Sequence, residues 1–127
     1  MEDPAVAVRA RLLEITGPEP GGPECALLVR LLTSYTVKTP PALERLAEAL
    51  AAGDLAAVQD QAHALKGSAA NIGAAELTDL FGELEDAARD GHLLEPRATL
   101  DRIHGAYGRV APVCTRIAGD LQQEAVR

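Results

Sequence analysis

Apolar residues recur through most of the chain at steps of three and four, the spacing that places side chains along one face of an α-helix. The longest such stripe lies near the C-terminus and runs unbroken through Leu100, Ile103, Tyr107, Val110, Cys114, Ile117 and Leu121. Three more stripes occupy residues 24–52, 55–71 and 74–89. The pattern therefore predicts four main helices, each with one face turned toward a shared core.

Two prolines complicate the segment 24–52. Its apolar stripe comprises Leu28, Leu32, Tyr35, Ala42, Leu46 and Leu50. Pro40 and Pro41 fall within it, and a proline inside a helix removes a backbone donor and crowds the preceding turn. The pattern leaves two possibilities open, a break at the prolines or one long helix with a kink.

Residues that start and stop helices stand between these segments. Asp3 and Pro4 form the favoured opening of a short additional helix over residues 4–15, an N-cap followed by proline at the first helical position. The stretch 16–23, rich in proline and glycine, is then a loop. The other boundary residues are Gly53, Gly73 and Gly91 at helix ends and Asp54 and Pro96 at helix starts. Pro112 is expected to bend the last helix.

Composition favours helices over sheets. Alanine and leucine are the most frequent residues and form helices well, whereas aromatic residues, which favour strands, make up only 2% of the chain. We expect an all-α fold, an antiparallel four-helix bundle with a short extra N-terminal helix. The length of 127 residues suits one domain, so we expect residues 1–127 to form a single domain.

Charge and cysteine content narrow the partners and the location. Twelve basic against nineteen acidic residues give a net charge of −7, which argues against binding to nucleic acid or to anionic membrane surfaces. The two distant cysteines, Cys25 and Cys114, are expected to be reduced thiols. The acidic start does not resemble a signal peptide, and no apolar run approaches the ~20 residues of a membrane span. These features predict a cytoplasmic protein.

One of the three histidines combines exposure with unusual neighbours. His92 lies in an expected turn, and His104 lies at the edge of the C-terminal stripe. His63 points about 130° away from the apolar face of its helix, on a helical wheel of 100° per residue. Gly67 follows one turn later on the same face, where glycine costs the helix about 1 kcal/mol relative to alanine. A glycine at this place suggests that another molecule must approach closely.

The chemistry of these positions suits acceptance of a phosphoryl group. A neutral imidazole is a nucleophile near pH 7, because the ordinary pKa of histidine is about 6.5. Lys66 lies one turn from His63, and its ammonium can offset the charge of roughly −2 that a phosphoryl group adds. Spacing alone does not distinguish this hypothesis from an exposed histidine without a role.

The segment from His63 to Gly73 resembles the signature of histidine-containing phosphotransfer (HPt) domains, H-x-L-K-G-S-x-x-x-x-G. The histidine, lysine, glycine and serine of the signature are all present in register. The resemblance covers about residues 24–91, and a helical C-terminal segment is consistent with the rest. Tyr35 is a departure, because the family more often has phenylalanine there.

The resemblance implies a phosphorelay intermediate. The family is a four-helix bundle in which an exposed histidine accepts a phosphoryl group from a phospho-aspartate of a receiver domain and passes it to another receiver domain. Carried over to this chain, His63 is the acceptor through Nε2, Lys66 steadies the phosphoryl oxygens and Gly67 permits docking. Glu85 occupies a position that can lie near the histidine. The resemblance also implies that the helix with two prolines is kinked rather than broken.

Partners and cofactors follow from the same resemblance. The expected partners are receiver domains of response regulators or of a hybrid histidine kinase, and the chain is expected to be a monomer. We expect no cofactor in this chain, because the Mg²⁺ ion should belong to the partner receiver domain. The sequence has no P-loop and nothing like an ATP lid of a kinase, so it should carry phosphate without kinase activity of its own.

Two other classes of protein stay open. A metal-containing bundle is suggested by Asp60-x-x-His63 and Asp101-x-x-His104, each a carboxylate and an imidazole three residues apart. Such ligands must point into the core, whereas His63 points outward. The second class is a helical adaptor that binds receiver domains without transfer, against which the intact signature argues. Metal analysis and incubation with a phosphorylated receiver domain distinguish these alternatives.

Overall fold

The computed structural model describes residues 3–93 and 95–126. Five α-helices follow one another, and the described residues contain no strand. The helices are α1 (Pro4–Thr16), α2 (Gly22–Ala52), α3 (Leu55–Ile72), α4 (Ala75–Arg89) and α5 (Pro96–Val126). The expected all-α class is confirmed, and the helices start within two residues of their expected positions.

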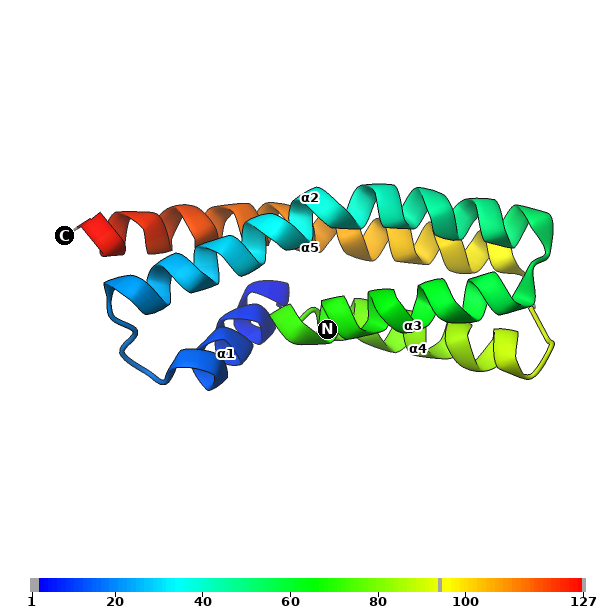
Figure 1. The fold of residues 1–127 in the computed structure, drawn as a ribbon, viewed down its shortest axis with the longest axis horizontal. Helices are drawn as coiled ribbons and strands as arrows, with labels where there is room; N and C mark the ends of the chain where they lie inside the picture. The colour runs from blue at the N-terminus through cyan, green and yellow to red at the C-terminus, as the bar shows by residue number, and fades with distance from the viewer. Residues whose placement is uncertain (1–2, 94, 127) are drawn as a thin grey trace.

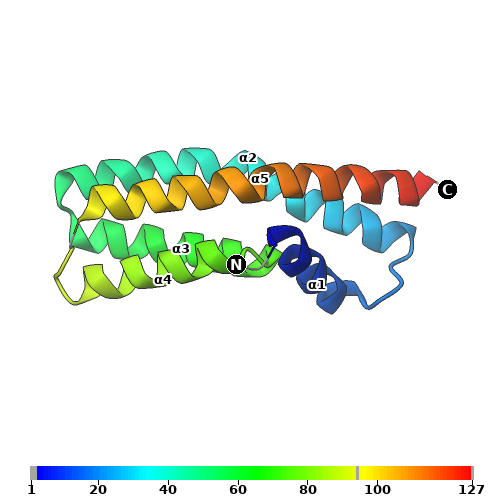
Figure 2. The same cartoon turned by 180° about the vertical axis from the view of Figure 1, so that it is seen from behind.

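The helices form a bundle with an additional N-terminal helix, as expected (Figure 1). The long helices α2 and α5 lie side by side and antiparallel, and the shorter α3 and α4 form an antiparallel hairpin against them. Since α3 packs on α2 and on α4, α5 is the helix diagonal to it. The view from behind shows that α2 and α5 extend past the end of this hairpin, where α1 packs beside it (Figure 2).

Side-chain caps and glycines set the ends of the helices, as expected. The carboxylate of Asp3 accepts a hydrogen bond from the Ala5 amide at 2.9 Å, and that of Asp54 accepts one from the Ala57 amide at 3.1 Å. Gly53 ends α2 in the left-handed conformation, with φ of 66°. These contacts satisfy backbone groups that have no partner within their own helix.

The helix α2 runs through both prolines without a break, and its axis changes direction about midway (Figure 1). Pro40 has no N–H to donate to the carbonyl of Thr36, and the hydroxyl of Tyr107 donates to that carbonyl instead, at 3.3 Å. The expected bend of α5 at Pro112 is not evident in either view, and α5 remains one helix.

The buried stripe of α2 differs from the expected one in its second half. Leu43 and Ala49 are buried, whereas Ala42 and Leu50, which were expected to point inward, are only partly buried. The reason is Thr39, which lies one turn after Tyr35 and is buried although it is polar. Its hydroxyl donates to the Tyr35 carbonyl at 2.6 Å, and a satisfied hydroxyl can occupy a core position.

Both cysteines are buried free thiols. Burial raises the pKa of Cys114 to about 11. Within the described residues, no helix is long and apolar enough to cross a membrane.

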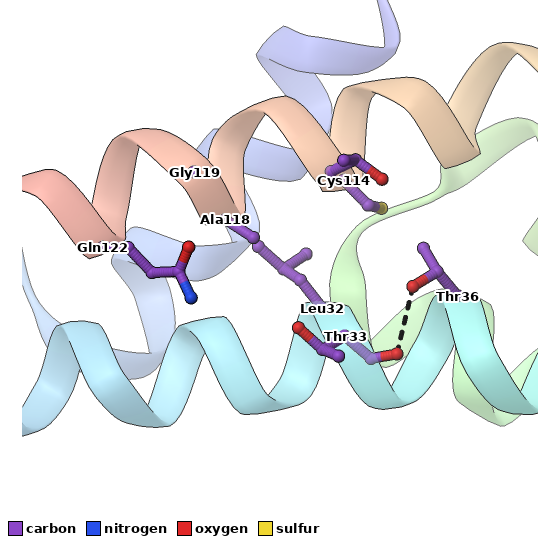
Figure 3. A pocket seen from close by; sticks show the side chains of 8 residues that line it. Leu32, Thr33, Thr36, Cys114, Ala118, Gly119 and Gln122 are labelled. Atoms are coloured by element: carbon purple, nitrogen blue, oxygen red, sulfur yellow. Dashed lines mark hydrogen bonds between the residues drawn. The ribbon is translucent and has the colours of Figure 1, made fainter.

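A cavity of about 400 Å³ lies along the seam between α2 and α5 (Figure 3). Its lining consists of small, apolar or uncharged polar side chains: Leu32, Thr33, Thr36, Cys114, Thr115, Ala118, Gly119 and Gln122. The helices that form it do not carry the histidine signature, which lies on α3. The chemistry expected at His63 is therefore separate from this cavity.

The helix α1 is fixed against the turn between α3 and α4. Gly73, in the left-handed conformation with φ of 81°, ends α3. A Cβ atom on Gly73 would lie 2.6 Å from Arg11 Cβ and 2.8 Å from the Ala7 carbonyl oxygen. Arg11 also donates from Nε to the Asn71 carbonyl at 3.2 Å. Glycine is thus required here both by backbone conformation and by the closeness of α1.

Replacing Gly73 should therefore destabilise the fold more than replacing Gly53. Gly53→Ala meets no atom within 4 Å and should cost only the left-handed conformation, about 1–2 kcal/mol. Gly73→Ala carries the same conformational cost and must also displace α1, which should add about 1–3 kcal/mol. Urea unfolding of the two variants measures the difference. Equal losses would show that α1 does not pack tightly against the turn.

Candidate functional site

The turn after α3 determines which residues of α3 and α4 face one another. Two antiparallel helices joined at Ala74 bring together residues at equal distances before and after it. His63 stands eleven positions before Ala74 and Glu85 eleven after it. Lys66 and Gly82 stand eight positions before and after it, and a Cβ added to Gly82 would lie 3.6 Å from Lys66 Cδ. The hairpin thus places Glu85 beside the histidine signature.

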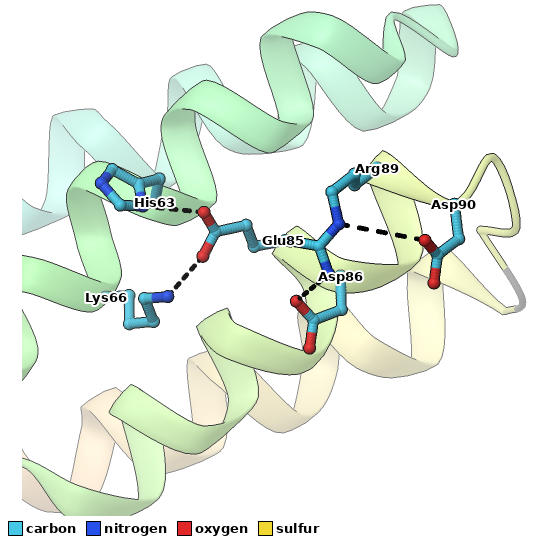
Figure 4. A network of polar contacts seen from close by, with 6 residues as sticks. All are labelled: His63, Lys66, Glu85, Asp86, Arg89 and Asp90. Atoms are coloured by element: carbon cyan, nitrogen blue, oxygen red, sulfur yellow. Dashed lines mark hydrogen bonds and ion pairs between the residues drawn. The ribbon is translucent and has the colours of Figure 1, made fainter.

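Three side chains meet at this place (Figure 4). Glu85 Oε2 lies 2.7 Å from His63 Nδ1, and Glu85 Oε1 accepts a hydrogen bond from Lys66 Nζ at 2.5 Å. The side chain of Glu85 is only 11% exposed, whereas that of His63 is 71% exposed. A carboxylate at the edge of the core therefore holds an imidazole that stands in solvent.

The charge of Glu85 decides which nitrogen of His63 carries the proton. The hydrogen bond from Lys66 has the largest effect and lowers the pKa of Glu85. Burial acts in the opposite direction, and the bond to His63 lowers the pKa further. An ionised carboxylate can only accept hydrogen bonds. Nδ1 of His63 must then be the donor, and in the neutral imidazole Nε2 keeps its lone pair. Nε2 has no hydrogen-bond partner among the described residues.

Lys66 neutralises this carboxylate. Its ammonium occupies the oxygen of Glu85 that His63 does not use. A metal ion at the same carboxylate would be repelled by the ammonium. In the described part of the chain, no group of three or more histidine, cysteine, aspartate or glutamate side chains is placed to hold a metal ion.

The surface around His63 is formed by small side chains. Gly67 lies mid-helix, and a Cβ added there would meet no atom within 4 Å. Ala56 and Ala70, each two turns from His63 on the same side of α3, are exposed, and Asp60 is exposed as well. Neither the backbone nor the packing requires glycine at position 67, so its effect is to leave space in front of α3.

The other expected candidates lie apart from this cluster. His92 is exposed in the connection after α4, and His104 is exposed on α5. Arg89 pairs with Asp86 at 2.8 Å and approaches Asp90 at 3.9 Å (Figure 4). These ion pairs are exposed, and such pairs contribute little to stability.

Comparison of the sequence with known protein families identifies the family of this chain. The Hpt domain family matches residues 30–113, well over half of the chain, including all of α3 and α4. The chain belongs to the Hpt domain family. The match begins later than the resemblance expected over residues 24–91, and it extends past residue 91 into α5. No curated protein and no solved structure matches this chain. As an Hpt domain, the protein has a phosphotransfer role in a phosphorelay.

Sequence reasoning placed Glu85 near the histidine only through the family resemblance. The sequence contains a signal for it, because Glu85 lies between Leu84 and Ala88 on the inner side of α4. A single acidic residue on a buried stripe requires a partner of opposite charge or a strong donor. The sequence did not indicate that this Hpt domain uses one carboxylate for both His63 and Lys66.

The role of Glu85 can be tested through acid unfolding. Because the pKa of Glu85 is lowered from 4.5 in the folded protein, its ionised form adds stability above about pH 4.5. That contribution is lost as the pH falls through the folded-state pKa. The difference in unfolding free energy between wild type and Glu85→Gln should therefore shrink toward low pH.

The control for this experiment is Glu83→Gln, which removes an exposed carboxylate from the same helix. A pH-independent difference between wild type and Glu85→Gln would contradict the ion pair. Nitrogen chemical shifts of His63 should also change in Glu85→Gln, because the acceptor that holds the proton on Nδ1 is weakened.

Proposed function

We propose that His63 is the phosphoryl acceptor of this Hpt domain and that its Nε2 atom receives the group from a phospho-aspartate of a receiver domain. The observation that carries the proposal is the 2.7 Å contact between His63 Nδ1 and Glu85, which directs the free lone pair of a neutral imidazole to solvent. An acceptor that stands on the surface suits a donor carried by another protein.

The transfer step balances as follows. The Nε2 lone pair attacks phosphorus, a bond between Nε2 and phosphorus forms, and the bond between phosphorus and the aspartate oxygen breaks. The aspartate leaves as a carboxylate. The ring of His63 keeps its Nδ1 proton and so becomes positively charged, and the carboxylate of Glu85 stabilises this charge where it develops. Transfer to a second receiver domain reverses these bond changes.

Lys66 supports the same step through the oxygens of the phosphoryl group. An ammonium has three donors, so Lys66 can keep its bond to Glu85 while it donates to an oxygen of the incoming phosphoryl group. Phosphoryl transfer depends mainly on positioning and on neutralising charge. The Mg²⁺ ion of the reaction belongs, in this proposal, to the receiver domain, and the group comes from that domain and not directly from ATP.

The first test is the substitution His63→Gln. The variant should acquire no acid-labile phosphate from any phosphorylated receiver domain, because an amide nitrogen is not a nucleophile. It should keep the helix content of wild type and lose no more than about 1–3 kcal/mol of stability, the cost of one hydrogen bond to the partly buried Glu85. Phosphate incorporation into the variant would assign the acceptor elsewhere. A wild-type protein that binds receiver domains and gains no phosphate would instead be the non-transferring adaptor.

A second test concerns the space in front of Gly67. Gly67→Gln should not lower the melting temperature, because glutamine favours a helix more than glycine does and no neighbour obstructs it. Its side chain projects beside His63, however, and a displacement of the partner by about 1 Å can cost roughly a hundredfold in rate. Transfer should slow accordingly, as measured with phosphorylated protein and a receiver domain.

The matched control is Gly108→Gln. Gly108 is also exposed within a helix and has no neighbour within 4 Å of an added Cβ, but it lies on α5, diagonal to α3. It should show the same helix stabilisation and an unchanged transfer rate. Equal transfer by both variants would contradict docking of the partner at Gly67.

A further inference from the structure

A polar cavity of about 180 Å³ lies between α2 and α3. Its polar lining includes Ser34 and Lys38 from α2 and Ser68 and Asn71 from α3. The volume corresponds to about six water molecules at roughly 30 Å³ each, enough for one short side chain. The cavity is thus suited to a small polar group.

The lining offers hydrogen-bond donors that nothing in the described structure uses. The hydroxyls of Ser34 and Ser68 and the side-chain amide of Asn71 make no hydrogen bond to any described residue. Several threonines behave differently, since their hydroxyls donate to carbonyls of their own helices, as Thr39 does. Ser68, Asn71 and Lys38 are exposed and Ser34 is partly buried, so these groups are hydrated in the free domain and are available to an acceptor that a partner brings.

The cavity also has one unbalanced charge. Lys38 forms no ion pair within 4 Å with a described residue, and no aspartate or glutamate lines the cavity. Lys66, by contrast, is already paired with Glu85. The lining therefore combines hydrogen-bond donors with the positive charge of Lys38, although the chain as a whole carries a net charge of −7. An anionic group is the complement that satisfies it.

The position of the cavity indicates where that anionic group comes from. Ser68 and Asn71 follow His63 by five and eight residues, about 7.5 and 12 Å along the helix axis. A standard protein interface covers about 800 Å² on each partner, a patch of roughly 16 Å radius. Ser68 and Asn71 also lie about 140° and 80° around α3 from His63, on the side that faces α2. A protein docked over His63 that extends across this side of α3 covers the cavity and removes water from Lys38. Covering an unpaired ammonium is unfavourable unless the partner supplies a negative charge.

We propose that this cavity receives an aspartate or glutamate side chain of the receiver domain that exchanges phosphate with His63, with Lys38 as its counter-ion. This inference rests on the proposed function and adds a determinant of partner choice to it. Receiver domains with an apolar or basic residue at the matching place leave Lys38 buried without a counter-ion and are rejected.

The experiment measures transfer from protein that has been phosphorylated with phosphoramidate, a small donor that needs no partner. Phosphate transfer is followed to a panel of purified receiver domains, and KM and kcat are determined for the fastest. Lys38→Glu should raise KM by about tenfold or more, with a smaller effect on kcat, because like charges then face each other. Lys38→Arg should keep KM within about twofold of wild type, since the cation is retained.

The control is Arg116→Glu, which changes the net charge equally but lies exposed on α5, diagonal to α3. A lysine introduced at the matching acidic residue of the receiver domain should restore transfer by Lys38→Glu, as a double-mutant cycle measures. Equal KM values for Lys38→Glu and Arg116→Glu would overturn the inference. So would saturable, Lys38-dependent binding of inorganic phosphate to the free domain, which would assign the cavity to a free anion.

These outcomes differ from failure of the proposed function. If the proposed function is wrong, phosphoramidate-treated wild type will pass its phosphate to no receiver domain, and the inference about the cavity will be wrong as well. If wild type transfers and Lys38→Glu transfers equally well, only the role of the cavity is wrong.

Discussion

The register between α3 and α4 is the constraint on which the functional cluster depends. A slip of one residue would turn a helix by about 100° and move it by about 1.5 Å, which is enough to separate Glu85 from His63. The turn at Gly73 prevents such a slip, because its left-handed backbone ends α3 at one position and α1 packs directly against it. The geometry of the site is thus decided at the far end of the hairpin.

The partly buried carboxylate links three residues that would otherwise be independent. Glu85 and Thr39 are the polar or charged residues that the described core contains. A buried carboxylate is tolerated only when its oxygens are satisfied, and here each oxygen has one partner. Stability and orientation therefore come from the same contacts: the interactions that keep Glu85 charged also fix the imidazole ring and hold the ammonium of Lys66 nearby.

Periodicity along the chain was sufficient for the helices and for the exposure of His63. Both depend on neighbours three and four residues away, which the sequence displays directly. The burial of Leu43 and Ala49 was missed because Thr39, a polar residue, continues the buried face of α2 between Tyr35 and Leu43. The spacing of apolar residues cannot show that a polar side chain is buried with its hydrogen bond satisfied.

Contacts between distant segments were harder to foresee. The hydroxyl of Tyr107 reaches a carbonyl that Pro40 leaves without its usual donor, and all of α3 and α4 lies between these two residues in the chain. The pairing of Lys66 with Glu85 is of the same kind, since ion pairs across a hairpin depend on side-chain directions as well as on register. The residues were visible in the sequence, but the distances between them were not.

If a receiver domain docks over His63 as proposed, the small side chains there also limit how long it stays. Alanine and glycine lose no rotamer freedom on docking and bury little apolar area, so Ala56, Gly67 and Ala70 add little to the lifetime of a complex. With an association rate constant near 10⁶ M⁻¹s⁻¹, a dissociation constant of about 10 μM corresponds to release about ten times per second. In the proposed mechanism, rapid departure of one receiver domain frees His63 for the next.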